Sequence, residues 1–197
     1  MSDEKVEVHP ATTDRWDDVA TLLGAGNTKQ HCWCTYFRMS SGDYSRSSDE
    51  EREQLLRDLT GRRPTPGLVA YAGGEPVGWI GLGPRADLER LHRSRTIPKI
   101  DDRPVWSVVC FLVRPGHRRR GIAHTLLAAA VDHARAEGAC GLEGYPADPD
   151  GGRLDNTFAY FGTVGLFESV GFRRVRPTGS RTSGRTRWVV RLDLDSD

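Results

Sequence analysis

The sequence predicts a mixed α/β domain with a central sheet of about seven strands and helices on both faces of the sheet. Three observations carry this prediction. Segments of strand character alternate with segments of helical period along the chain. The nearly unbroken apolar run at 105–113 is typical of a strand covered on both faces. After Gly121, apolar residues recur with the spacing of an amphipathic helix.

The N-terminal third provides a strand and two helices. Val6 and Val8 alternate with polar residues, which predicts a short first strand. A helix is expected over roughly 14–25. A second helix starts near Ser47 and Ser48, since either hydroxyl could serve as its N-cap.

The remaining elements follow in the order strand, strand, strand, helix, strand, helix, strand, strand. Gly73-Gly74 between two strand-like segments predicts a hairpin. The polar stretch 84–104 is expected to be irregular, with one or two helical turns. The predicted bounds are strands at 67–72, 75–82, 105–113, 139–145, 172–175 and 187–194, helices at 121–137 and about 158–170, and loops at 146–156 and 177–186. With no repeat and no domain-sized linker, residues 1–197 are expected to form one domain.

Composition narrows the class of protein. The 28 basic and 27 acidic side chains give a net charge of +1, so the chain as a whole is not a polyanion binder. The four cysteines do not form a disulfide-rich pattern, and Cys32-x-Cys34 has no second ligand pair at zinc spacing, so no metal is predicted. The chain has no apolar run of signal-peptide or membrane-span length. We therefore expect a reduced, soluble, cytoplasmic protein with no membrane partner.

The most basic run of the chain lies between the apolar strand and the helix that follows it. Residues 113–123 read V-R-P-G-H-R-R-R-G-I-A. An open α/β sheet presents its ligand crevice at such a junction. The first turn of a helix has unpaired N–H groups and partial positive charge, which phosphate oxygens satisfy. Gly121 would let a diphosphate approach the backbone closely. A solvated basic loop or a nucleic-acid patch is the alternative, although no aromatic residues interleave with these arginines.

At this point the sequence resembles a known family. Arg118-x-x-Gly121-x-Ala123 is similar to the acyl-coenzyme A binding signature of the GNAT superfamily of N-acetyltransferases, and the segments "LLAAAVDHA" and "GLFESVGFRRV" also resemble that family. The resemblance covers about 67–192 in element order. It implies a mostly antiparallel sheet whose central strands splay apart, acetyl-CoA as co-substrate, direct acetyl transfer to an amine, and possible pairing into a homodimer.

The resemblance also implies roles for individual residues. Backbone N–H groups of the basic run would hold the pyrophosphate, and a main-chain N–H near the end of the central strand would bind the thioester carbonyl. Phe167 occupies the position where many members carry a tyrosine that protonates the leaving thiolate, and phenylalanine cannot do so. The cofactor-binding residues implied are Phe111, Leu112, Val113, Arg118, Arg119, Arg120, Gly121, Ile122, Ala123 and Phe167.

Three residues are candidate substitutes for the missing catalytic groups. Tyr160 lies seven residues before Phe167, on the same face of the predicted helix at 158–170. Tyr145 ends the fifth strand, near the expected splay, and Glu143 lies on that strand among apolar residues. Glu143 is the candidate base and the tyrosines are candidate acids. The alternatives are packed rings with satisfied hydroxyls and a surface carboxylate.

The acceptor is expected between two irregular stretches, 26–47 and 146–157. The first brings Trp33, Tyr36 and Phe37, and the second brings Asp148 together with Asp150 and Asp155. Aromatic walls and carboxylates suit a cationic amine. Core packing of the aromatic residues and turn formation by the aspartates are the alternatives.

The function these patterns predict is transfer of the acetyl group from acetyl-CoA to a primary amine of a small molecule, in a ternary complex. Two alternatives stay open: a protein lysine or N-terminal acetyltransferase, and a CoA-binding regulatory module without turnover. Nucleic acid is not expected as a partner. The six arginines of 173–187 are expected to lie on a solvated hairpin.

Overall fold

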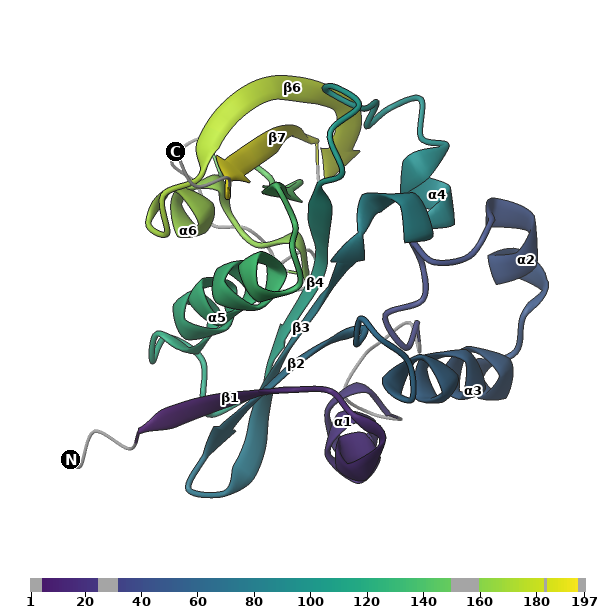
Figure 1. Cartoon of the computed structure of the whole chain (residues 1–197), viewed down its shortest axis with the longest axis vertical. Coiled ribbons are helices and arrows are strands. Elements are labelled where there is room, and N and C mark those ends of the chain that lie inside the picture. The colour runs from purple at the N-terminus through teal and green to yellow at the C-terminus, as the bar shows by residue number, and fades with distance from the viewer. Residues whose placement is uncertain (1–4, 25–31, 150–159, 183, 195–197) are drawn as a thin grey trace.

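A computed structural model describes residues 5–24, 32–149, 160–182 and 184–194. Its centre is a seven-stranded sheet of order β1-β2-β3-β4-β5-β7-β6 (Figure 1). All neighbouring strands are antiparallel except β4 and β5, which are parallel, so the expectation of a mixed, mostly antiparallel sheet is confirmed. The strands are β1 (Val6–Pro10), β2 (Gly67–Ala72), β3 (Glu75–Pro84), β4 (Trp106–Val113), β5 (Gly141–Gly144), β6 (Arg173–Thr182) and β7 (Arg185–Asp193).

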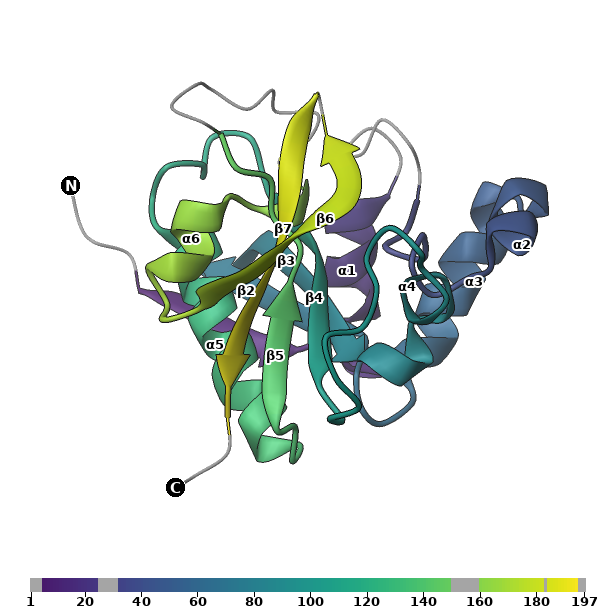
Figure 2. The same ribbon diagram turned by 90° about the horizontal axis from the view of Figure 1, so that it is seen from above.

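Helices cover both faces of the sheet, as expected. Figure 2 shows α5 and α6 on one side of the strands, with α1, α3 and α4 on the other. The helices are α1 (Trp16–Leu23), α2 (Ser41–Arg46), α3 (Asp49–Thr60), α4 (Glu89–His92), α5 (Ile122–Ala136) and α6 (Val164–Glu168). No helix among the described residues is long and apolar enough to cross a membrane.

Each face of the sheet has its own hydrophobic core. Against α5, the buried residues Leu126, Leu127 and Ala130 pack on sheet residues that include Val108 and Leu142. Against α1, Leu22 and Leu23 belong to a second cluster of buried residues. The amphipathic helix predicted after Gly121 is therefore confirmed as α5, whose apolar face packs on the sheet.

The two central strands separate soon after they begin. β4 and β5 pair only at Trp106↔Leu142 and Ser107↔Glu143. The β3–β4 register also shifts, from Gly81↔Cys110 to Leu82↔Val108, which is a β-bulge at Val109. Beyond Ser107, none of the described strands pairs with β4 on its β5 side. This leaves a slot in the middle of the sheet, with β4 amides along one edge.

Three elements differ from the prediction. The described part of the predicted helix at 158–170 contains only α6, since Thr163 is its N-cap and accepts a hydrogen bond from Leu166 N; residues 158 and 159 lie outside the described residues. The predicted loop at 177–186 mostly belongs to the β6–β7 hairpin. A short helix, α2, forms within the stretch 26–47 because Ser40 caps it through Asp43 N.

Candidate functional site

The loop between β4 and α5 is tightly turned. It is tied to β3 by the Arg114 N–H, which donates to Val77 O at 2.9 Å. Within the loop, Gly116, Arg119 and Gly121 all have left-handed backbone angles, with φ of +88°, +63° and +77°. Glycine adopts these angles without strain, which explains two of the three positions. The turn brings the chain directly to the first N–H groups of α5.

Those first N–H groups of α5 are not capped by a side chain. Gly121 is the N-cap, makes no side-chain hydrogen bond, and is followed by no acidic residue in the first turn. By contrast, Ser48 and Glu51 form a full capping box on α3. A 15-residue helix with a free N-terminus presents unpaired donors and partial positive charge to whatever lies in front of it.

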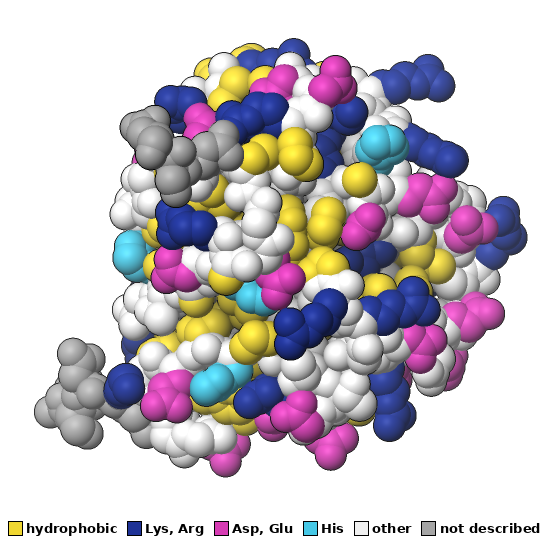
Figure 3. All heavy atoms as spheres, viewed as in Figure 1, with side chains coloured by type: hydrophobic (Ala, Val, Ile, Leu, Met, Phe, Trp, Pro, Cys, Tyr) yellow, Lys and Arg dark blue, Asp and Glu magenta, His cyan; other side chains and the backbone are white. Residues whose placement is uncertain are grey.

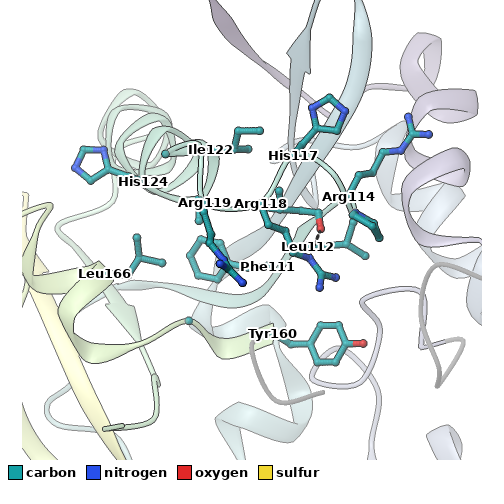
Figure 4. Close-up of a pocket in the computed structure, with 15 residues that line it drawn as sticks. Phe111, Leu112, Arg114, His117, Arg118, Arg119, Ile122, His124, Tyr160 and Leu166 are labelled. Atoms are coloured by element: carbon teal, nitrogen blue, oxygen red, sulfur yellow. Dashed lines mark hydrogen bonds between the residues drawn. The ribbon is translucent and has the colours of Figure 1, made fainter. Parts of the chain in front are cut away.

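A cavity of about 370 Å³ lies in front of this helix end, between the loop, the end of β4 and the segment before α6. Figure 4 shows Arg118 and Arg119 pointing across the cavity toward Tyr160, while His117 and His124 point away. Arg118 is held by its Nε, which donates to Val113 O at 3.1 Å. Apart from the adjacent residues, no atom of the described part of the chain lies within 4 Å of the position that a Cβ of residue 121 would occupy, which leaves open space on this side of the backbone.

Most of the residues that the sequence assigned to the cofactor border this cavity. They are Phe111, Leu112, Val113, Arg118, Arg119, Gly121, Ile122 and Ala123. Arg120 is exposed and is not part of the cavity wall.

Phe167 requires a correction, because it is fully buried and does not border the cavity. Its ring packs edge-to-face against Phe111 and Phe172, with centroids 5.9 and 5.0 Å away. A Cβ on Gly144 would lie 2.2 Å from this ring, so the glycine leaves room for the ring to cover the end of β5. Phe167 is therefore a core residue and is not part of the described wall of the cavity.

Tyr160 borders the cavity but reaches it from another element than predicted. It lies in a single turn before α6 and not on that helix, so the expected helical spacing from Phe167 does not exist. The side chain is half-buried, and burial raises the pKa of its phenol. The hydroxyl is therefore protonated at neutral pH and able to donate a proton.

Glu143 and Tyr145 lie in a buried network at the start of the slot. The Tyr145 hydroxyl donates to Glu143 Oε2 at 2.9 Å, lies 2.8 Å from Ser107 Oγ, and accepts from Arg85 Nη1 at 2.5 Å. Burial raises the pKa of Glu143, although Tyr145, Arg85 and Arg191 oppose this shift. Burial likewise raises the pKa of Tyr145.

Neither residue borders the cavity in front of α5. Glu143 borders a different cavity of about 430 Å³, beside the start of β4. The carboxylate is thus neither a surface group nor part of the described wall of the cavity in front of α5.

A second cavity of about 520 Å³ lies between the segment before α2, the residues around α4 and the β6–β7 hairpin. Two of the predicted acceptor residues, Tyr36 and Phe37, are in its wall. Four arginines and one glutamate also border it, which makes it basic. These are Arg90, Arg93, Arg95, Arg187 and Glu89.

The other predicted acceptor residues lie elsewhere. Trp33 is buried in the core, where it stacks on Trp16 with centroids 5.9 Å apart. Asp148 is ion-paired with Arg174 at 2.5 Å and does not border the cavity. Asp150 and Asp155 lie outside the described residues. The carboxylates expected around a cationic acceptor are therefore not found in the described wall of this cavity, apart from Glu89.

Sequence reasoning missed the four arginines of this cavity. Three of them lie in the polar stretch 84–104, which has no motif to mark it. The fourth, Arg187, was expected on a solvated hairpin, but only 4% of it is exposed. Over the face shown in Figure 3, basic and acidic side chains are interspersed and no extended basic patch forms. Among the described residues no group of three or more His, Cys, Asp or Glu could hold a metal ion.

Two consecutive residues connect the cavities. Tyr160 borders the cavity in front of α5. The ring of Phe161 lies 6.0 Å from that of Phe37 and 3.7 Å from Arg187 Cζ, and both of these residues border the second cavity. Residues 160 and 161 therefore link the wall of one cavity to two wall residues of the other.

Comparison with known proteins agrees with this architecture. The model of the acetyltransferase (GNAT) family matches residues 30–148. Among curated proteins, none matches this chain. A GNAT-family acetyltransferase of Streptococcus pneumoniae superposes with a TM-score of 0.56 at 14% identity, covering 97% of this chain and 100% of the other. The ribosomal-protein-S18-alanine N-acetyltransferase of Escherichia coli superposes with a TM-score of 0.54 at 14% sequence identity. The match covers 98% of this chain and 96% of the other.

A third solved structure contains the cofactor of its own protein. The acetyltransferase yncA of Salmonella typhimurium, solved with acetyl-CoA, gives a TM-score of 0.51 at 17% identity, covering 98% of this chain and 95% of the other. At such identities the structures establish the fold, and the family model, which spans more than half of the chain, establishes the family. The chain belongs to the GNAT family of acetyltransferases, enzymes that transfer acetyl groups from acetyl-CoA.

Proposed function

We propose that this protein transfers the acetyl group of acetyl-CoA to a primary amine of a small molecule, by direct attack in a ternary complex. One observation carries the proposal: the uncapped N-terminus of α5 opens on one cavity, and a second, aromatic-walled cavity adjoins it across Tyr160 and Phe161. One cavity suits a phosphate-bearing cofactor and the other suits an acceptor.

The residues present fit acetyl-CoA. The free N–H groups of the first turn of α5 would hold the diphosphate, with Arg118 and Arg119 adding charge beside it. The empty space beside Gly121 accommodates a group as large as a phosphate. When bound, acetyl-CoA supplies an acetyl group activated as a thioester.

The free edge of β4 stabilises the charge that develops on the thioester carbonyl. Beyond Ser107 this edge has no strand partner, so N–H groups among Val108–Val113 that face the slot are available to donate to the oxygen. A donor of this kind contributes about 3 kcal/mol to transition-state stabilisation in other acyl-transfer enzymes.

Tyr160 is the proposed acid. As the amine nitrogen bonds to the carbonyl carbon, the carbon–sulfur bond breaks, the amine gives up a proton to water, and Tyr160 donates one to the departing sulfur and then regains a proton from water. Glu143 and Tyr145 are proposed as positioning residues, because their network holds Ser107, the last residue of β4 that pairs with β5. They keep the slot open at a fixed point in the sheet.

The experiment that tests this proposal is calorimetric titration with acetyl-CoA, followed by thiol release with a panel of amines and, in parallel, peptides with a free lysine or N-terminus. Binding together with thiol release that depends on a small amine supports the proposal. Release with peptides alone identifies a protein acetyltransferase instead. Binding without release from any acceptor indicates a CoA-binding module without turnover.

A further inference from the structure

We propose that the acceptor carries, besides its amine, an anionic oxygen group such as a carboxylate or a phosphate, which Arg187 binds in the second cavity. This inference rests on the proposed function, since it names the chemical class of the amine. It reverses the expectation of a purely cationic acceptor held by aspartates.

Arg187 is a buried side chain in which one nitrogen, Nη2, has no hydrogen-bond partner within the described part of the chain. Its Nε donates to Tyr145 O at 2.8 Å, and its Nη1 lies 3.5 Å from Ser180 Oγ. Nη2 is buried and has no hydrogen-bond partner among the described residues. A buried donor without a partner costs about 1–3 kcal/mol, and more when it is charged. Arg187 borders the second cavity, so a ligand oxygen bound there would lie close to this guanidinium.

The charge of Arg187 is also uncompensated. No carboxylate of the described residues forms an ion pair with it, in contrast to Arg191, which pairs with Asp101 and Asp193. Burial lowers the pKa of Arg187 to about 10, so the guanidinium remains cationic at neutral pH. The face of Phe161, 3.7 Å from Cζ, supports the cation but supplies no hydrogen-bond acceptor. A buried cation of this kind is stabilised by an anion that arrives with the substrate.

The other arginines of the cavity favour the same ligand. Arg90 is engaged: it stacks on Tyr36 at 4.0 Å and donates to Ser40 O at 3.2 Å. Arg93 pairs with Glu89 at 3.2 Å on the exposed rim. Arg95 is exposed and adds further positive charge. Arg187 is therefore the deep donor that an oxyanion would reach, and the rim arginines attract it from solution.

The geometry also places the anion at a useful point. Arg187 rests on Phe161, whose neighbour Tyr160 borders the cofactor cavity. An acceptor whose anionic end is fixed at Arg187 has its other end free to reach across this segment toward the acetyl group. Fixing one end of a small molecule in this way reduces the entropy lost on reaching the reactive geometry.

The test compares matched amines and monitors Arg187 directly. Thiol release is measured for amines that differ only in a carboxylate, such as amino acids and their carboxamides, with wild type, Arg187→Gln and Arg187→Lys. Arg181→Gln is the control, since Arg181 is exposed on the same hairpin and donates to Gly184 O. Independently of turnover, the Nε–H resonance of Arg187 is followed by NMR during titration with acetate and with inorganic phosphate.

We expect carboxylate-bearing amines to be preferred by about tenfold to a hundredfold in kcat/KM, the range for hydrogen bonds to a charged group. Arg187→Gln should abolish this preference, Arg187→Lys should keep part of it, and Arg181→Gln should leave it unchanged. The Arg187 resonance should move with at least one anion, and the anion that binds more tightly identifies the group as carboxylate or phosphate. If Arg187→Gln fails to fold, the amine preference and the NMR titration of the wild-type protein still test the inference.

An Arg187 resonance that stays unmoved by both anions, together with equal turnover of each carboxylate and its carboxamide, would overturn the inference. If the resonance responds to an anion but no amine releases thiol, the proposed function fails while the anion site stands. The two failures are therefore distinguishable.

Discussion

Tyr160 and Phe161 are consecutive residues, of which the first lines the cavity in front of α5 and the second contacts two wall residues of the other cavity. Tyr160 is in the wall of the cofactor cavity, and Phe161 contacts Phe37 and Arg187 in the wall of the second cavity. The proposed acid is thus adjacent in the sequence to a residue that contacts the proposed acceptor site. Changes at these two positions should separate chemistry from acceptor binding.

Gly121→Trp should abolish acetyl-CoA binding, because the indole would fill the empty space in front of α5. Gly116→Trp is the matched control: it has a similar positive φ, and nothing lies near its Cβ position, but it does not border the cavity. Each substitution should cost about 1–2 kcal/mol of stability, since both place a side chain in the left-handed region. Calorimetry should show affinity lost in the first variant and retained in the second. Equal affinity in both would contradict the phosphate assignment.

Arg118→Gln and Arg119→Gln should each weaken acetyl-CoA binding by about tenfold, which is the effect of losing a charged hydrogen bond. Arg120→Gln should have little effect, because Arg120 is not part of the cavity wall. The loss should shrink as salt concentration rises, since these side chains are exposed. Affinities measured at two ionic strengths check this. The same loss at Arg120 would indicate general attraction by the loop and no specific contact.

Tyr160→Phe should lower kcat by about tenfold to a hundredfold with unchanged acetyl-CoA affinity, at the low end of general-acid effects because the thiolate is a tolerable leaving group. Tyr71→Phe is the control, since its hydroxyl bonds to Asp18 outside both cavities. Because burial raises the pKa of Tyr160, the acid should stay protonated to beyond its ordinary value of about 10. Wild-type kcat should therefore not decline below that pH through loss of this proton. Full activity of Tyr160→Phe would remove the residue as acid.

Glu143→Gln should change the pH dependence of stability. Because burial raises the pKa of Glu143 above 4.5, its contribution to folding is complete below pH 4.5 and is lost as the pH rises through the higher folded value. The free energy of unfolding of wild type should thus fall relative to Glu143→Gln as the pH is raised from 4.5. Urea unfolding at several pH values measures this, with the exposed Glu75→Gln as control.

The same variant also tests the role of Glu143 in turnover. A positioning residue predicts parallel pH profiles of kcat for wild type and Glu143→Gln. A loss confined to neutral pH, where an amine needs a base, would instead restore the carboxylate as that base.

Gly144→Ala should destabilise the fold by about 1–3 kcal/mol, because the new methyl group would lie 2.2 Å from the fully buried ring of Phe167. Gly165→Ala is the control, since nothing lies within 4 Å of its Cβ position in α6. Thermal unfolding of the two variants checks the difference. Equal stability would mean that the ring has room to shift.

Secondary structure was predicted most accurately from the sequence where a periodic apolar pattern forms a buried face. The run at 105–113 and the stripe after Gly121 became β4 and α5 because burial on the sheet enforces those periods. The loop between them could be located because the end of β4 and the start of α5 were both predicted. Most of the residues that line the cavity in front of α5 could therefore be named from the sequence.

The second cavity and the buried network around Tyr145 could not be predicted in this way. Arg85 and Arg187 are charged residues in polar stretches, and nothing local shows that Tyr145 and its neighbours bury them. Phe167 was misplaced because a family position implies an orientation, whereas Gly144 across the sheet decides where the ring packs. These outcomes depend on contacts between residues that are distant in the sequence.

The separation of β4 from β5 means that two half-sheets, β1–β4 and β5–β7–β6, are joined by only two residue pairs. Along the slot, the ladder that would bind the halves together is missing. A ligand arm lying there and accepting from β4 acts as a substitute strand, so the continuity of the sheet depends on occupancy. Loading the protein with its cofactor would then slow amide hydrogen exchange along the inner edge of β4, and each round of turnover would remove and restore that protection, while the core under α5 keeps the two half-sheets together.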